Sequence, residues 1–128
     1  MKVRDPLFIL YVHDMERAVN FYRATFELTL IQHSPGWSML RFGGSTIALH
    51  MLFPGNTEST SPHAGLSFQV ADLDRAIEEV VAAGGKHLVT REPDGFVPVR
   101  MCEVQDSEGN GIELRQHIGK GPDLTSIK

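Results

Sequence analysis

Hydrophobic residues near the start of the chain first alternate with other residues and then recur at helical spacing. Phe8, Leu10 and Val12 alternate, which is the period of a strand with one buried face. Asp14 can cap a helix with its side-chain oxygen. The apolar positions that follow fit one face of a helix, and they are Met15, Ala18, Val19 and Tyr22. The pattern predicts a strand that ends near residue 12 and a helix that begins near residue 15.

The same pattern recurs 58 positions further along the chain. The matched pairs are Val12 and Val70, Asp14 and Asp72, Arg17 and Arg75, and Ala18 and Ala76. An alternating strand pattern again precedes the aspartate, an apolar helical stripe follows it, and Gly84-Gly85 ends the second helix. The chain therefore contains two copies of one predicted structural unit.

After each predicted helix, the pattern becomes that of three strands joined by turns. In the first half the strands are residues 28–33, 37–42 and 45–52. In the second half they are residues 86–90, 99–105 and 111–116. We therefore predict an α+β fold of two tandem βαβββ modules, at about residues 5–53 and 63–117. Residues 54–62 are predicted to be a linker, and residues 118–128 a mobile tail. Each half is too small to bury much alone, so we expect a shared core and a cleft between the modules.

Composition narrows the possible partners and locations. The chain has 128 residues and a net charge of −4, which argues against a nucleic-acid or anionic membrane surface. No apolar run approaches the length of a membrane span or a signal-peptide core. The single cysteine, Cys102, cannot form an internal disulfide. It alternates with Val104 and lies near Val99, so we expect a buried structural thiol. These features predict a cytoplasmic protein.

The two "V-x-D" helix starts and the segment "DSEGNGIEL" at residues 106–114 resemble the vicinal oxygen chelate superfamily. That group includes glyoxalase I, the extradiol dioxygenases and the bleomycin-resistance proteins. The resemblance covers about residues 5–117. It implies a cupped, incomplete mixed β-barrel with helices outside, and a homodimer.

The resemblance also implies where a metal ion would be held. Its four ligand positions fall on Leu7, Ala48, Gly65 and Glu113, and only Glu113 can bind a metal. His50 and His63 lie two residues from two of these positions, which keeps each on the same face but moves it about 6 to 7 Å along the strand. A divalent metal bound by His50, His63 and Glu113 is one hypothesis. The favoured hypothesis is that no metal is bound and that the histidines lie at the cavity mouth or in solvent.

Glu113 has two interpretations that the sequence leaves open. It could be a catalytic carboxylate in a cavity, acting as a metal ligand or as a general base whose pKa is raised by apolar neighbours. It could equally be an ordinary polar residue at an alternating position of the closing strand.

Alternation also predicts which side chains line the cup. Leu40 and Phe42 should face the helix, which places Trp37, Met39 and Arg41 on the other face. The remaining predicted ligand-binding residues are Tyr11, His50, Ser67 and Met101. This mixture of aromatic, apolar and scattered polar groups is typical of a small-molecule site. Arg41 is either a partner for a ligand carboxylate or phosphate, or a surface arginine, and Trp37 either contacts the ligand or packs at a dimer interface.

We therefore predict a homodimer of the bleomycin-resistance type that binds a small organic molecule without a catalytic metal. The alternative is a divalent-metal-dependent lyase, isomerase or dioxygenase that uses Glu113 with the shifted histidines. Metal-free acid–base catalysis by Glu113, or a structural member with no ligand, are further hypotheses. No nucleic-acid or membrane partner is expected.

Overall fold

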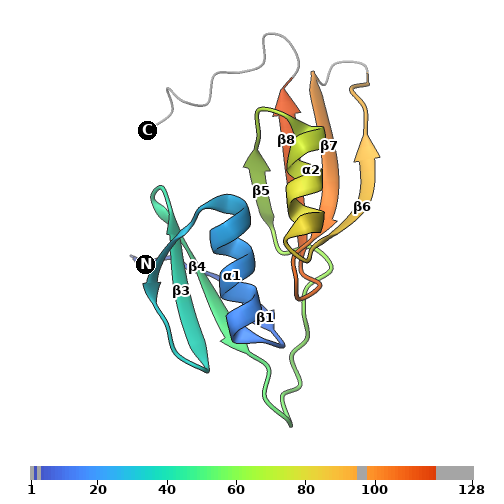
Figure 1. Ribbon diagram of the computed structural model, residues 1–128. Helices are drawn as coiled ribbons and strands as arrows, with labels where there is room; N and C mark the ends of the chain where they lie inside the picture. Colours follow the sequence, from blue (N-terminus) through green and yellow to red (C-terminus); the bar gives the residue numbers. More distant parts are fainter. Residues whose placement is uncertain (1, 3, 95–97, 118–128) are drawn as a thin grey trace.

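The fold is a pair of similar modules, seen side by side in Figure 1. The computed structural model describes residues 2, 4–94 and 98–117, so the predicted tail lies outside the described residues. The first module contains β1 (Phe8–Val12), α1 (Met15–Phe26), β2 (Thr29–Gln32), β3 (Trp37–Phe42) and β4 (Ser45–Met51). The second contains β5 (Leu66–Gln69), α2 (Leu73–Ala82), β6 (Lys86–Arg91), β7 (Val99–Gln105) and β8 (Gly111–His117). The predicted α+β fold with two βαβββ modules is confirmed.

Each module forms its own open sheet of four strands. The strand orders are β1-β4-β3-β2 and β5-β8-β7-β6, so the two orders are equivalent. The first strand of each module runs parallel to the last, and the other neighbours are antiparallel. β1 and β5 are therefore edge strands, and the two sheets do not close into one barrel.

Both helices begin where the sequence predicts. The Asp14 side chain accepts a hydrogen bond from the backbone N–H of Arg17 at 3.0 Å, and Asp72 accepts one from the N–H of Arg75 at 3.1 Å. Both aspartates have extended backbone angles, as N-cap residues do. The repeated sequence segment thus contains a helix cap in each module, and each cap fixes where its helix begins.

The two modules share one hydrophobic core on the helix side of their sheets. It includes Leu10 and Leu49 of the first module and Leu66 and Leu114 of the second. Phe26 at the end of α1 packs against Phe68 of β5, with ring centroids 4.8 Å apart. A hollow of about 330 Å³ lies at this junction. A cleft between the modules is therefore present. It lies next to the shared core, on the side of the sheets that the helices cover, and not on the sheet faces turned away from the helices.

A buried glutamate in the β7–β8 turn joins the second module to the start of α1. Its carboxylate accepts hydrogen bonds from the backbone N–H groups of His13 and Asp14, both at 2.8 Å, and from Nε of Arg17 at 2.7 Å. Burial raises the pKa of this Glu108 carboxyl, but the hydrogen bonds from Arg17, Asp14, Ser107 and His13 outweigh burial and bring the pKa below its ordinary value. Glu108 is therefore an ionised clasp between the modules.

Asp106 and Asn110 extend this clasp. Asp106 accepts a 2.7 Å hydrogen bond from the hydroxyl of Tyr22 on α1, and Nδ2 of Asn110 donates to the carbonyl of Tyr11 at 3.0 Å. Burial, followed by the negative charge of Asp106, raises the pKa of Tyr22 well above its ordinary value, so the phenol stays protonated and donates. We call residues 106–110 the clasp turn.

Neither α1 nor α2 is long and apolar enough to cross a bilayer, and this holds for every helix within the described residues.

Candidate functional site

The face of the first sheet that is turned away from α1 carries an aromatic row, and we call this face the first cup face. Strand register places Tyr11 opposite His50, and His50 opposite Trp37. The His50 ring lies 5.3 Å from that of Tyr11 and 6.0 Å from that of Trp37, both edge to face. The structure thus brings together three predicted ligand-binding residues.

His50 has one ring nitrogen already in use. Its Nδ1 lies 3.0 Å from the carbonyl oxygen of Met51, so Nδ1–H donates there and Nε2 is left as an acceptor in the neutral ring. The side chain is half-buried between its two aromatic neighbours. Its orientation is therefore fixed, and it contributes an aromatic surface with one acceptor to the row.

The next row along the same face is entirely apolar. Ile9, Ala48 and Met39 lie opposite one another across β1, β4 and β3. Ile9 is 48% exposed although it is large and hydrophobic. An apolar surface beside three aromatic rings is typical of a small-molecule site.

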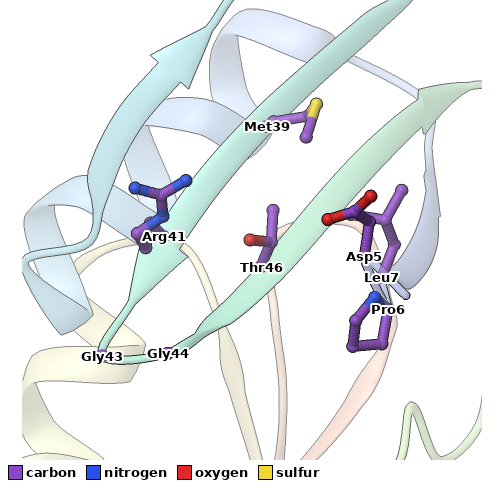
Figure 2. Close-up of a pocket in the computed structure, with 8 residues that line it drawn as sticks. All are labelled: Asp5, Pro6, Leu7, Met39, Arg41, Gly43, Gly44 and Thr46. Carbon is purple, nitrogen blue, oxygen red and sulfur yellow. The ribbon is translucent and has the colours of Figure 1, made fainter. Parts of the chain in front are cut away.

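The third row contains Thr46 opposite Arg41, at the end of the strands near the Gly43-Gly44 turn. A hollow of about 500 Å³ lies here, lined also by Asp5, Leu7 and Met39. Figure 2 shows Arg41 and Asp5 on opposite sides of this hollow, with Thr46 between them. Alternation along the strands predicted that Arg41 and Met39 lie on this face. Thr46 was not predicted, although it is two residues from Ala48 and therefore on the same face.

The second sheet presents a very different surface at its equivalent face, which we call the second cup face. Ser67 lies opposite Glu113, and Glu113 opposite Glu103. The next row contains Gln69, Arg115 and Met101. Of the two predicted ligand-binding residues on this sheet, Ser67 lies in the carboxylate row and Met101 lies in the row beside it.

Glu113 belongs to a polar network on this face. The hydroxyl of Ser67 donates to its carboxylate, and Nη1 of Arg115 donates to the same hydroxyl at 2.7 Å. Glu103, directly opposite, lies 3.4 Å from Nη1 of Arg91. The neighbours of Glu113 on this face are thus polar or charged, not the apolar neighbours that the sequence hypothesis assumed.

The residues available do not match a metal site within one chain. His63 lies before β5, and its Nδ1 accepts a hydrogen bond from the N–H of Gly65 at 3.0 Å. Within residues 2, 4–94 and 98–117, no group of three or more histidine, cysteine, aspartate or glutamate side chains could hold a metal ion. His50, His63 and Glu113 are therefore not gathered into such a group. A metal site built from them would need a second chain, and it stays a prediction.

His33 has a structural role that the sequence did not reveal. The residue was expected on a strand but follows the end of β2. Its Nδ1 lies 2.9 Å from Oγ of Ser38 and its Nε2 lies 2.7 Å from Oε1 of Glu16. Although a serine, a histidine and a glutamate are linked in this way, Ser38 is fully buried and cannot reach a substrate. The contacts hold β3 to the start of α1.

Comparison with known proteins places this arrangement among characterised folds. The model of the Glyoxalase/Bleomycin resistance protein/Dioxygenase superfamily matches residues 6–114. A glyoxalase-related enzyme from Fulvimarina pelagi is similar in structure, with a TM-score of 0.71 and 19% identity over 89% of this chain and 88% of that chain. No curated protein matches the chain.

Two further similar structures have different described roles. The fosfomycin resistance protein FosX from Listeria monocytogenes, complexed with Mn(II) and sulfate, has a TM-score of 0.69 and 22% identity, covering 94% of this chain and 92% of that chain. TnmS3, an antibiotic binding protein from Streptomyces sp. CB03234, has a TM-score of 0.64 and 25% identity, covering 91% of this chain and 98% of that chain. The same fold thus accompanies both a metal complex and an antibiotic-binding protein.

Proposed function

The chain belongs to the Glyoxalase/Bleomycin resistance protein/Dioxygenase superfamily, and we propose that it binds a small organic molecule on the first cup face without a catalytic metal. The observation that carries the proposal is the aromatic row of Tyr11, His50 and Trp37 beside the apolar row of Ile9, Ala48 and Met39. Apart from Ala48, which is fully buried, these side chains are half-buried or exposed on one sheet face, and such a surface favours a ligand with apolar surface.

The donor set supports binding in preference to metal-dependent catalysis. Three of the four positions at which the family places metal ligands are Leu7, Ala48 and Gly65, which have no side-chain donor atom. Glu113 is engaged with Ser67 on the other sheet. The described residues of one chain therefore do not fit a divalent metal centre, and the antibiotic-binding protein is the closer functional parallel.

We propose that the protein works as a homodimer in which a second copy closes the cup. β1 and β5 are both edge strands, so one side of each has no neighbouring strand within the part of the chain that the structure describes. Leu7, Phe8 and Ile9 at β1 are 39%, 44% and 48% exposed, so the edge is apolar as well as open. Such an edge is covered in most native proteins, and a second chain would cover it.

Thermal-shift measurements on protein purified without a histidine tag test the proposal. Aromatic organic compounds in a broad screen should raise the melting temperature by several degrees. At saturating concentrations, this corresponds to a stabilisation of the folded state by about 1 to 3 kcal/mol. A chelator should leave the melting temperature unchanged. Stoichiometric copurified metal, together with a lower melting temperature after chelation, would contradict the proposal and support the metal-dependent enzyme.

Two controls make the result specific. Glu113→Ala should leave binding of the small molecule on the first cup face intact. If metal copurifies with the protein, retention of the metal in this variant would exclude Glu113 as a metal-binding residue. Sedimentation should give twice the mass of the 128-residue chain. A monomer across the micromolar range would remove the dimer from the proposal.

A further inference from the structure

We infer that the ligand is an elongated aromatic anion, which lies along β3 with its ring at the aromatic row and its acidic group at Arg41. This inference rests on the proposed function and adds the chemical class of the ligand. Its basis is the order of the three rows on the first cup face, which runs from aromatic through apolar to cationic along a single strand.

The spacing of the rows sets the length of the ligand. Trp37 and Arg41 are four residues apart on the same face of β3, which corresponds to about 13 Å between their Cα atoms. Met39 lies between them, opposite Ala48. Because no polar side chain interrupts this middle row, the part of the ligand that joins its two ends is apolar.

Arg41 is the charged group left available on this face. Its side chain is exposed and forms no ion pair or side-chain hydrogen bond with another described residue. By contrast, Arg91 pairs with Glu103, Arg100 with Asp74, and Arg115 donates to Ser67. An unpaired guanidinium at the end of an apolar surface favours a carboxylate, sulfonate or phosphate, which it can bind through two parallel hydrogen bonds.

Thr46 and Asp5 restrict where the anion can lie. The register places Thr46 directly opposite Arg41, so its hydroxyl can act as a second donor. The Asp5 carboxylate lines the other side of the same hollow (Figure 2), where it repels an anion. The acidic group is therefore confined to the side of the hollow nearest Arg41 and Thr46.

A series of phenylalkanoic acids tests both the charge and the length. Phenylacetate, 4-phenylbutyrate, 6-phenylhexanoate and 8-phenyloctanoate are titrated against the protein, together with the corresponding neutral amides. Trp37 is the only tryptophan of the chain, so its fluorescence reports directly on the aromatic row. We expect the preference for acid over amide to be absent for phenylacetate and to reach about tenfold for the longer acids, the size of one charged hydrogen-bond pair.

Substitutions at the cationic end assign this preference to its source. Arg41→Gln should reduce the affinity for the preferred long acid about tenfold and leave its amide unchanged, and Arg41→Lys should restore part of the loss. Asp5→Asn should strengthen acid binding about twofold by removing a repulsive charge. Arg23→Gln, on the exposed side of α1, is the matched control and should change nothing.

The two proposals fail in different ways in this experiment. If the amides bind as tightly as the acids at every length, or if Arg41→Gln leaves the preference intact, the anionic ligand is ruled out while aromatic binding and the proposed function stand. If neither series changes Trp37 fluorescence, the inference is also overturned, and the broad thermal-shift screen then judges the proposed function separately.

Discussion

The two modules share a scaffold but present opposite chemistry on their cup faces. In register, the aromatic row of Tyr11, His50 and Trp37 corresponds to Gln69, Arg115 and Met101, and the apolar row of Ile9, Ala48 and Met39 corresponds to Ser67, Glu113 and Glu103. The helix-facing positions that form the shared core are apolar in both modules. A duplicated fold thus keeps the side that packs and varies the side that is free to bind.

The last hairpins of the two modules also differ. The β3–β4 hairpin turns through Gly43-Gly44 alone, whereas the β7–β8 hairpin turns through the five-residue clasp turn. The shorter turn borders the hollow near Arg41. The longer one holds the modules together through Glu108 and Asp106. One hairpin therefore borders the proposed ligand site, and the other has a structural role.

Gly111→Ala should have the largest effect, because this position has no room for a side chain. A Cβ atom at Gly111 would lie 1.9 Å from the carbonyl oxygen of Pro62, whereas the corresponding residue of the first module, Thr46, carries a side chain. We expect a loss of about 3 kcal/mol or more, measured by urea unfolding. Gly44→Ala, with nothing within 4 Å, is the control and should change stability little. Equal stability of the two variants would contradict the close approach.

Glu108→Gln should show how much the clasp turn contributes to stability, apart from the contribution of the shared core. Loss of the buried charge next to Arg17 should cost about 2 to 3 kcal/mol at neutral pH. Because the pKa of Glu108 lies below its ordinary 4.5 in the folded chain, its contribution is complete above that value and is lost as the pH falls through the folded pKa. The stability difference between wild type and variant should therefore shrink in acid.

The control for this experiment is Glu78→Gln, an exposed residue of α2. It should leave the unfolding free energy within about 0.5 kcal/mol of wild type. A difference between wild type and Glu108→Gln that is as large at pH 3 as at pH 7 would show that the clasp acts through packing and not through the ionised carboxylate.

The smallest expected effect concerns Ser38 and Cys102, which occupy corresponding positions on β3 and β7. Both are fully buried, and burial is the main cause of the raised pKa of the Cys102 thiol. We expect a thiol reagent at pH 8 to label native protein far more slowly than unfolded protein. A Ser38→Cys variant should gain a second thiol that is equally protected. Rapid labelling of Cys102 would show that β7 is less tightly packed than the structure indicates.

Sequence patterns predicted the structural features that depend on residues close together in the chain. Asp14 and Asp72 were predicted as helix caps because capping acts over three residues, and Trp37 and Met39 were placed on one face because strand side chains alternate. The clasp turn was missed, since Glu108 reaches His13 across 95 positions, a pairing without periodicity. The hollow beside Arg41 was missed for the same reason, because it combines Asp5 with two distant strands.

The most direct test of the difference between the modules compares Trp37→Ala with Met101→Ala, a substitution at the corresponding position of the second sheet. Calorimetric titration with 8-phenyloctanoate should show more than a tenfold loss of affinity for Trp37→Ala, as removal of an aromatic anchor does. Met101→Ala should stay within about twofold of wild type. A larger loss for Met101→Ala, or no loss for Trp37→Ala, would contradict the placement of the ligand site on the first cup face.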